Sequence, residues 1–538
     1  MIGTYHHHLY ASPVVYAAVV LVFLASVIFR RIYFHPYRHV PGPLLAKITS
    51  GYSAWHSWRG SMHLDVQRCH ERYGTSLPWN NILIQIQSAD AGTNRRPETK
   101  AIYGHGAPFR KSKGYATMCP VPGGWTTMTS IDKPLNQRLR RVFRAGTGAK
   151  QLAKFEPAIL RRLKICLDQL QVDNGWSRSA DMRRWSLCLG FDTMADFGLG
   201  IETNLLRSSD RDFVFPPLHF HEKKLGLWEQ LPALNNVGLG ILVSAAYPVV
   251  SPKARRFYKW CLDFLDRASE RNRSESRGIF GPVIQSGHGN LSPAGHNRAQ
   301  MMGESFFSVS SSAEPYAILL SGFFHYLGHY RQVYERLAGE MRSLYGPGED
   351  IVWDAKLESN VYLRAVINEL LRLLPPACGV HWRECEAPGV SVGPDQTPVS
   401  VGSDAGMSIF SLFRDGRLYR EPLRFWPERW LPGVLPEDEF RTAKKAFTPF
   451  LIGPRNCAGG HISIMMASIA FAYTLVNADF RLGPEQADLV RRRSETACRH
   501  VGAEFELAFA SHSSITCWES GPFIQFSGRA TEKSVLPT

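Results

Sequence analysis

Several long stretches of the chain place apolar residues at helical spacing. Over 152–170, 257–268 and 317–345, apolar residues recur three or four positions apart with charges between them. This pattern predicts helices that each bury one face. The stretch 459–475 is apolar on nearly every side, which predicts a helix enclosed in the core.

Segments of β type are few and short. They occur near 82–86 and 398–401, where Val and Ile gather between turn-forming residues. The stretch 426–449 is rich in Pro, Gly and charge, so we expect an irregular meander there. The predicted fold class is mainly α with small β-sheets.

The N-terminal segment is apolar enough to cross a bilayer. The run 13–29 carries no charge and is 17 residues long, at the lower edge of a bilayer span, and Leu9 and Tyr10 extend it. Arg30 and Arg31 follow directly, and positive charge on this side places the rest of the chain in the cytoplasm. A cleaved signal peptide carries positive charge before its apolar run, whereas only histidines precede this one. We therefore expect an uncleaved, single-pass transmembrane helix.

The segment after this helix predicts a hinge. Residues 40–43 read Val-Pro-Gly-Pro, which neither a helix nor a strand can continue through. No later stretch has the composition of a linker, and no internal repeat is visible. The predicted organisation is an anchor over 1–31, a hinge over 32–45 and one catalytic domain over 46–538.

Charge limits the classes of partner. The chain has 62 Lys and Arg against 47 Asp and Glu, a formal charge of +15, which suits nucleic acid, an anionic membrane or an acidic protein. The basic residues are dispersed among acidic ones and form no nucleic-acid-binding motif, so we expect no nucleic-acid partner. A non-enzymatic basic scaffold held near acidic lipids is the alternative from another class. It predicts clustered basic runs and no cofactor motif.

Cysteine usage indicates a reducing compartment. The sequence holds 10 cysteines, and none forms a Cys-x-x-Cys pair. Zinc-site spacing is therefore absent, and a disulfide framework is not expected in a chain of this size. We expect nine of these residues to be buried thiols and one, Cys457, to carry chemistry.

The residues around Cys457 suit a thiolate ligand to haem iron. Phe450, Gly453, Arg455 and Gly459 surround it in a short segment. Such a ligand needs a tight loop with backbone N–H groups aimed at the sulfur, and glycines let the backbone turn and approach the porphyrin. An arginine can pair with a haem propionate. The apolar helix that follows adds the positive end of its dipole.

This segment matches the Phe-x-x-Gly-x-Arg-x-Cys-x-Gly pattern of the cytochrome P-450 family. The chain therefore resembles these haem-thiolate monooxygenases, and the segments 102–106 and 109–112 resemble filamentous-fungal members in particular. The resemblance implies the cytochrome P-450 fold, haem b as the cofactor and Cys457 as the axial ligand of the iron. Phe450, Gly453, Arg455 and Gly459 then belong to the cofactor site.

Glu369 and Arg372 resemble the Glu-x-x-Arg pair of the same family. The spacing alone is uninformative, since 270–273 and 421–424 share it and such pairs are usually exposed helix-face ion pairs. This pair, however, lies in an apolar helix upstream of a Pro-Glu-Arg segment that contains Arg429. By resemblance, Glu369, Arg372 and Arg429 form a buried structural triad that holds the cysteine loop.

Three more basic residues are assigned to the haem by resemblance. Arg383 falls where the family places an arginine that binds one propionate. Lys133 and Arg138 fall near the helix that covers the other propionate, although an exposed basic helix face explains them equally well.

The sequence departs from the family at the oxygen site. The family motif there ends in an acid followed by Thr, and this chain has Glu314 followed by Pro315. Proline within a helix removes one backbone hydrogen bond and kinks the helix. The carbonyl that loses its partner is that of Ser311.

Three interpretations of this departure stay open. In the first, Pro315 keeps the groove open by geometry, and protons arrive through Glu314, an ordered water, or the hydroxyls of Ser311, Ser312 or Tyr316. In the second, the enzyme rearranges or dehydrates an already oxidised substrate without activating oxygen. In the third, the chain is an inactive member or carries a mispredicted exon boundary here.

The resemblance also implies a substrate and partners. Apolar side chains with a few hydroxyls suit a lipophilic small molecule, here a terpenoid, polyketide or alkaloid intermediate of fungal secondary metabolism. Electrons come from NADPH through NADPH–cytochrome P-450 reductase, whose acidic docking surface suits the basic chain; dioxygen is the co-substrate and the endoplasmic reticulum membrane the location. The candidate substrate-facing residues are 118–125, Phe306, Phe307, Ser310, the segment from Ala377 to Val380, and 511–515.

Overall fold

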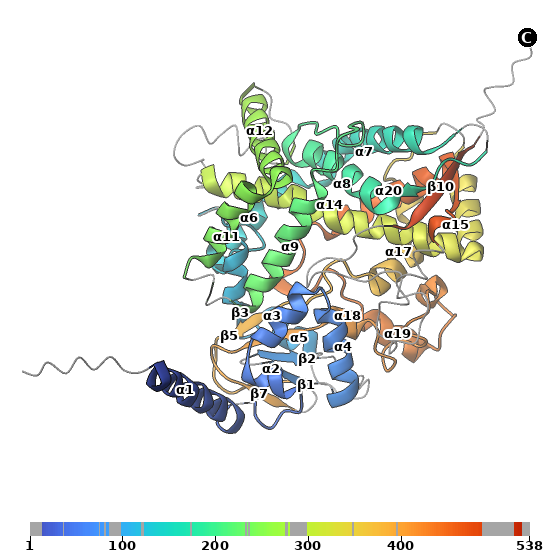
Figure 1. The fold of residues 1–538 in the computed structure, drawn as a ribbon. Coiled ribbons are helices and arrows are strands. Elements are labelled where there is room, and N and C mark those ends of the chain that lie inside the picture. The colour runs from blue at the N-terminus through green and yellow to red at the C-terminus, as the bar shows by residue number, and fades with distance from the viewer. Residues whose placement is uncertain are drawn as a thin grey trace, which may run out of the picture.

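The computed structural model of the protein describes most of the chain and confirms a mainly helical fold with small sheets. Residues not described are 1–12, 36, 75, 80–81, 86–97, 120–122, 173–174, 232–233, 235–236, 275–277, 280–297, 347–348, 394–395, 487–520 and 530–538. The longer helices gather in one half of the molecule, and the largest sheet lies in the other half (Figure 1).

The helical half is built around one long central helix, α14. The long helices of this half are α7 (Ala149–Leu170), α8 (Met182–Leu199), α9 (Phe215–Gln230), α12 (Pro252–Ser274), α14 (Arg298–His329), α15 (Arg331–Leu344), α17 (Val361–Leu373) and α20 (Gly460–Asn477). Helix α8 packs so closely on α14 that a Cβ added at Gly190 would lie 2.7 Å from the carbonyl oxygen of Ala313. The largest hydrophobic cluster fills the space between these helices.

Shorter helices surround this core and connect it to the sheets. They are α2 (Leu44–Ile48), α3 (Gly51–Trp58), α4 (Met62–Tyr73), α5 (Glu98–Tyr103), α6 (Lys133–Gly146), α11 (Leu239–Val250), α16 (Ala355–Glu358), α18 (Ile409–Leu412), α19 (Glu437–Ala446), and the 3₁₀ turns η1 (Lys113–Met118), η2 (Pro427–Trp430) and η3 (Gly453–Arg455). Asp132 caps α6 by accepting a hydrogen bond from the backbone N–H of Leu135 (2.7 Å).

The strands of the described residues form three small sheets. The largest has the order β1-β2-β8-β5-β3, and only its β2–β8 pair is parallel. The second has the order β4-β10-β9, and the third pairs β6 with β7. The strands are β1 (Ser76–Trp79), β2 (Ile82–Gln85), β3 (Phe109–Lys111), β4 (Ala180–Asp181), β5 (Arg383–Cys385), β6 (Val390–Val392), β7 (Thr397–Val399), β8 (Asp404–Met407), β9 (Ala478–Leu482) and β10 (Phe523–Gly528).

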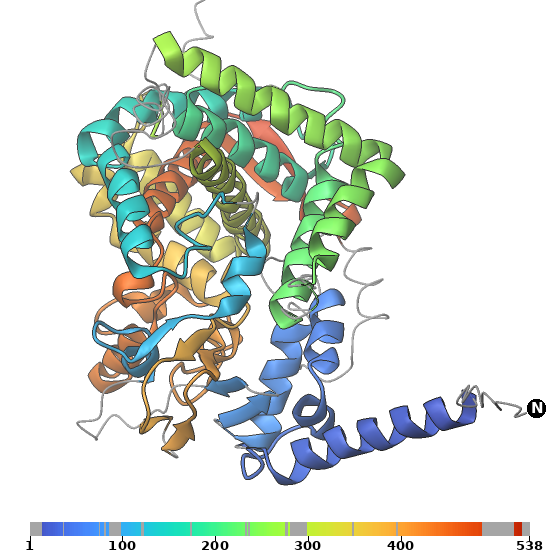
Figure 2. The same cartoon turned by 90° about the vertical axis from the view of Figure 1, so that its left-hand side faces the viewer.

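The N-terminal helix projects away from the rest of the protein. Helix α1 (Pro13–Tyr33) extends from the sheet-containing half, as both views show (Figures 1 and 2). Its segment Val15–Tyr33 is long and apolar enough to span a membrane, and none of it is buried. The helix Gly460–Asn477 is also long and apolar enough to span a membrane, but it is 78% buried. It is therefore a core helix. Helix α1 thus suggests a membrane anchor.

The structure corrects two predictions of secondary structure. The expected single helix 317–345 is two helices, because Tyr330 leaves helical geometry (φ −97°, ψ 74°) between α14 and α15. Its ring packs on Phe425, which fixes the break through tertiary contact. The expected irregular meander contains the ten-residue helix α19. Three acidic residues in its first turn and two lysines in its last turn favour this helix through the helix dipole.

Candidate functional site

The segment around Cys457 forms a tight loop at the start of α20. The backbone N–H of Cys457 donates to the carbonyl of Phe450 (2.8 Å), and that of Asn456 donates to the carbonyl of Gly453 (3.2 Å). Gly459 is the N-cap residue of α20, and its N–H hydrogen-bonds the sulfur of Cys457. The loop therefore points a backbone donor and the positive end of a helix at the thiol.

Two glycines allow this loop to form. Gly453 has φ +77°, and a Cβ there would collide with the carbonyl oxygen of Tyr103, so any other residue would displace the loop. A Cβ at Gly460 would lie 3.0 Å from the ring of Phe450. The aromatic ring thus rests on the first turn of α20.

The Cys457 side chain is accessible although it lies deep in the protein. The residue is exposed, yet burial among surrounding protein atoms raises the pKa of its thiol, against the lowering effects of the Gly459 N–H and the charge of Arg140. A ligand can therefore reach this thiol within the interior. Among the other cysteines, six are buried and Cys119 is half-buried, while Cys498 and Cys517 lie outside the described residues.

Two arginines bind the loop to the segment that precedes α6. Arg455 donates through Nη1 to the carbonyl of Ser130 (2.8 Å) and through Nη2 to that of Ile131 (2.8 Å). Arg140 of α6 donates to the backbone carbonyl of Asn456 (2.6 Å) and to its side-chain oxygen (2.7 Å). Both arginines thus lie directly beside the cysteine loop.

Two further cations approach from the large sheet. Arg383 of β5 is 4% exposed and stacks over the rings of Tyr103 and Tyr115. Burial, and then the positive charges of Arg383, Arg455 and Arg140, hold the pKa of Lys111 well below its usual range. Burial, Arg383 and Arg140 likewise lower the pKa of Arg455 to about 10. Lys111, Arg140, Arg383 and Arg455 therefore form one cluster of mutually repelling cations, called the cation cluster below.

Lys133 and Arg138, which the resemblance assigned to the haem, stay a prediction, and the structure places both on α6. The Nζ of Lys133 pairs with Glu386 (2.8 Å) at an exposed position. Arg138 is half-buried, and its Nε has no hydrogen-bond partner among the described residues. Arg140, which sequence reasoning missed, joins the cluster because it lies one turn after Asn136, a buried residue of α6. The sequence contains no signal for Arg140, because tertiary contacts decide which face of α6 packs inward.

This arrangement fits a haem. Four cations gathered in the interior require anions nearby, and the two propionates of haem supply them through charge-assisted hydrogen bonds. The accessible thiol of Cys457 is of the kind that ligates haem iron. Cys457, Arg455 and Arg383 were expected in this role from the sequence, and the structure brings them to one region.

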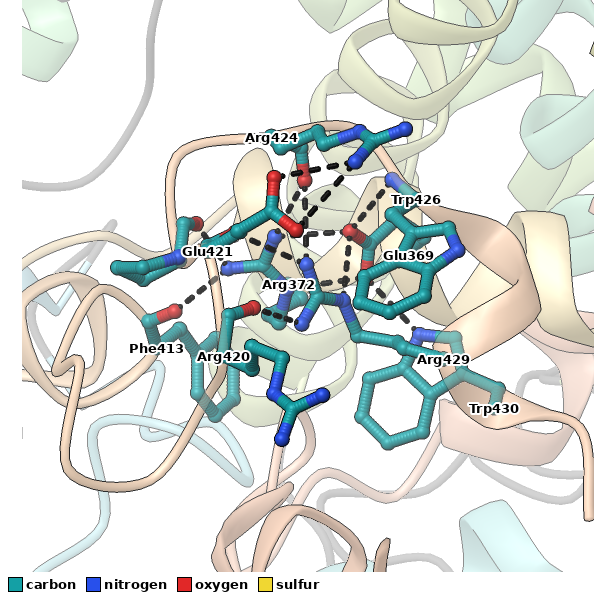
Figure 3. A network of polar contacts seen from close by, with 10 residues as sticks. Glu369, Arg372, Phe413, Arg420, Glu421, Arg424, Trp426, Arg429 and Trp430 are labelled. Atoms are coloured by element: carbon teal, nitrogen blue, oxygen red, sulfur yellow. Dashed lines mark hydrogen bonds and ion pairs between the residues drawn. The ribbon is translucent and has the colours of Figure 1, made fainter. Parts of the chain in front are cut away.

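Glu369, Arg372 and Arg429 meet in a buried network (Figure 3). Each has an exposed fraction of 0%. Glu369 accepts from Arg372 Nε (2.9 Å) and Nη2 (2.8 Å) and from Arg429 Nε (3.1 Å). It also accepts from the backbone N–H of Trp426 (3.0 Å) and the indole N–H of Trp430 (3.0 Å). One carboxylate thus receives five hydrogen bonds.

The same network holds the chain segment that leads to the cysteine loop. Arg372 donates to the carbonyl of Phe413 (2.7 Å), and Arg429 donates to that of Glu421 (3.0 Å). Burial alone would raise the pKa of Glu369, but the charges and hydrogen bonds of the two arginines outweigh it and lower that pKa. The carboxylate is therefore ionised at neutral pH.

The central helix α14 continues through Pro315, the position at which this sequence departs from the family motif. Glu314 is buried and its carboxylate pairs with Arg183 of α8, so the acid expected at the oxygen site is already bound by a cation. Tyr316 is buried beside Cys166 of α7, which directs it into the helical core. Ser311 and Ser312 are half-buried.

The candidate substrate-facing residues are placed on three elements. Phe306, Phe307 and Ser310 lie on α14, with Phe307 and Ser310 half-buried. Ala377 is exposed and Val380 is buried in the segment after α17. Of the two candidate loops, 118–125 is described in part, and 511–515 lies outside the described residues.

Comparisons with known proteins agree with this site. The sequence model of the family "Cytochrome P450", written P-450 here, matches residues 310–500, which contain α17, the triad and the cysteine loop. Cytochrome P-450 monooxygenase atnE of Emericella nidulans is 29% identical over 96% of this chain and 97% of its own. Cytochrome P-450 monooxygenases apf7 of Gibberella fujikuroi and poxM of Penicillium oxalicum are 26% and 28% identical, each over 96% of this chain and over 97% and 94% of their own.

These relatives are fungal, as the N-terminal half of the sequence indicated, and they align with nearly the whole chain. Together with the matched family model, they account for the fold, the accessible cysteine and the cation cluster. The chain therefore belongs to the cytochrome P-450 family and is a haem-thiolate monooxygenase of the oxidoreductase class.

Proposed function

We propose that this enzyme inserts one oxygen atom of dioxygen into a lipophilic intermediate of fungal secondary metabolism, with a haem whose iron Cys457 would bind. The observation that carries the proposal is the accessible thiol of Cys457 in a loop bound by Arg140 and Arg455. A terpenoid, polyketide or alkaloid is the substrate class proposed. The monooxygenase names of the fungal relatives support the reaction type.

The chain would hold the haem at its iron and at its two propionates. Cys457 would bind the iron, and Lys111, Arg140, Arg383 and Arg455 would pair with the two propionates. Haem supplies the one-electron and dioxygen chemistry of the reaction. The Gly459 N–H stabilises negative charge on the sulfur.

The triad would hold the cysteine loop in place during this reaction. Glu369, Arg372 and Arg429 bind several backbone carbonyls of the segment 413–424, a short distance before the loop in sequence. They touch neither substrate nor cofactor in this account. Their proposed role is structural.

Proton delivery would differ from that of family members with Thr at position 315. We propose that Pro315 keeps the helix groove open, because it leaves the carbonyl of Ser311 without its helical N–H partner. Protons would come through Glu314, an ordered water, or the hydroxyls of Ser311 and Ser312. The ion pair with Arg183 holds Glu314 on the side of α14 that faces α8, so a relay through Glu314 requires this pair to open.

A second function is favoured by Pro315 itself. A haem-thiolate enzyme that rearranges or dehydrates an oxidised substrate does not consume dioxygen and needs no proton relay for that purpose. Such an enzyme tolerates loss of the hydroxyl at position 315. An inactive chain is the third possibility raised by the same residue.

Isotope labelling separates these functions. A fungal host that carries the gene for this chain is compared with the same host without the gene. Both cultures grow under labelled dioxygen, and the lipophilic products in their extracts are analysed. The proposal predicts a lipophilic product that gains one labelled oxygen atom and appears only with the intact gene. A gene-dependent product without label would instead establish the rearrangement, and no gene-dependent product would indicate an inactive chain.

The proposed redox partner and location follow from the same assignment. NADPH–cytochrome P-450 reductase would supply the electrons, and the +15 formal charge favours encounter with an acidic docking surface. Helix α1 would hold the enzyme in the endoplasmic reticulum membrane, with the domain 46–538 in the cytoplasm and the segment 32–45 as a hinge. Arg30 and Arg31 at the end of α1 support this orientation.

A further inference from the structure

Thr127 joins three separate parts of the protein. Its backbone N–H and its hydroxyl donate to the two carboxylate oxygens of Glu304 on α14, at 2.7 and 2.8 Å. Its carbonyl accepts from Lys111 of β3 (3.2 Å) and from Asn136 of α6 (2.7 Å). Every backbone polar group of Thr127 is therefore bound to a different element.

Glu304 provides the contact with the central helix. Its exposed fraction is 4%, so its charge is withdrawn from water and must be satisfied by neighbouring groups. The contact is reinforced one residue earlier, because a Cβ at Gly303 would collide with the carbonyl of Gly124. The loop that contains Gly124 and Thr127 thus lies directly on the N-terminal part of α14.

The carboxylate of Glu304 lies on a functional face of this helix. Residues 304, 308, 311 and 315 follow one another at steps of four, three and four, which places Glu304, Ser308, Ser311 and Pro315 on one side of α14. Ser311 and Pro315 mark the proposed oxygen site. Glu304 therefore fixes a loop over the same helix face, about 16 Å along the axis from Pro315.

Lys111 connects this contact to the cation cluster. Its Nζ also donates to the carbonyl of Met128, and the negative charge of Glu304 opposes the effect of the three arginines on its pKa. Arg455 holds the next residues of the same loop through the carbonyls of Ser130 and Ile131. The loop 123–131 is thus bound to α14 on one side and to the cation cluster on the other.

We propose that Glu304 is a positioning residue that clamps the loop 123–131 onto α14 through Thr127, and that this clamp controls how bulky ligands reach the haem. The inference rests on the proposed function, since it concerns access to the same site. Glu304 contacts neither the iron nor the reacting atoms in this account. Its effect passes through the position of the loop.

The size of the ligand distinguishes this role from general stabilisation. A loosened loop admits a large molecule faster but leaves the approach of a diatomic molecule unchanged. The experiment therefore compares the association of a bulky phenyl-substituted imidazole with the rebinding of carbon monoxide after photolysis, both read from the haem absorption of the full chain. Hydrogen–deuterium exchange of residues 123–131 reports the loop itself.

Three variants and one control define the test. Glu304→Ala removes both acceptors, Thr127→Val removes only the hydroxyl donor, and Glu304→Gln keeps the shape and one acceptor. Glu270→Ala is the matched control, since Glu270 is an exposed helical glutamate. If Glu304→Ala fails to fold, Thr127→Val carries the test, because it leaves the backbone hydrogen bond of Thr127 in place.

The clamp predicts a graded result. With two buried hydrogen bonds lost, Glu304→Ala should raise the imidazole association rate about tenfold, which corresponds to about 1.4 kcal/mol. Carbon monoxide rebinding should stay unchanged, exchange of 123–131 should accelerate, Thr127→Val should show a smaller effect, and Glu304→Gln should restore most of the wild-type rate. The inference would be overturned if Glu304→Ala and Thr127→Val both showed the same imidazole association rate and the same exchange of residues 123–131 as the Glu270→Ala control.

Failure of the proposed function gives a different result. If the wild-type chain shows no haem-thiolate spectrum, the ligand rates cannot be measured and the proposed function fails. The exchange comparison still tests the clamp on the loop in that case. Unchanged exchange would then overturn the inference independently.

Discussion

Replacing Glu369 by Gln tests whether the buried triad holds the fold together. Gln has nearly the same volume, but it removes the only carboxylate that the described structure places between Arg372 and Arg429. Two guanidinium groups with 0% exposure then share a neutral partner. Breaking a buried ion pair in this way costs about 3–5 kcal/mol. We expect a loss of this size in the free energy of unfolding, measured by urea titration with tryptophan fluorescence.

A pair with the same spacing provides the control. Glu421 and Arg424 also form a Glu-x-x-Arg pair (3.0 Å), but their side chains are 50% and 55% exposed. Exposed pairs contribute about 0.5 kcal/mol or less, so Glu421→Gln should be nearly neutral. Equal losses for Glu369→Gln and Glu421→Gln would refute the claim that burial, and not the sequence motif, gives the triad its importance.

Three further predictions concern proton delivery, attachment and pH. Glu314→Gln should sharply lower the product formed per electron consumed, and unchanged coupling measured with NADPH oxidation would exclude a relay through Glu314. Removal of residues 1–33 should move the protein to the soluble fraction, whereas a high-salt wash of the intact chain should not; release by salt would contradict a spanning helix. Burial raises the pKa of Glu304 from 4.5 to about 7. Between these two pH values the folded state binds more protons than the unfolded state, so the free energy of unfolding should fall as the pH rises from 4.5 to about 7. Glu304→Gln should remove this slope in urea titrations, and an identical slope in the variant would show that other groups cause it.

The parts of the site that lie close together in sequence were predictable. The order of Phe450, Gly453, Arg455, Cys457 and Gly459 describes one loop and the start of one helix, so local geometry follows from the residues themselves. The triad was also predictable by resemblance, although its partners are 60 positions apart for Glu369 and Arg429. The apolar setting of Glu369 separated it from the exposed pair at 421–424.

The contacts between distant segments were not predictable from the same patterns. The hydrogen bonds between Thr127 and Glu304 join residues 177 positions apart, and no periodicity marks either residue. The part played by Arg140 depends on which side of α6 packs inward, and the break at Tyr330 depends on packing against Phe425. Tertiary contacts decide each of these, and the pairing of Glu314 with Arg183 belongs to the same group.

The carbon monoxide difference spectrum of the reduced full chain in yeast microsomes is the most direct test of whether Cys457 ligates haem iron. A thiolate ligand from Cys457 predicts a strongly red-shifted Soret band, and Cys457→Ser should abolish that band while the protein is still produced. Well-expressed, folded wild-type protein without the red-shifted band would contradict the assignment of Cys457 as the haem ligand.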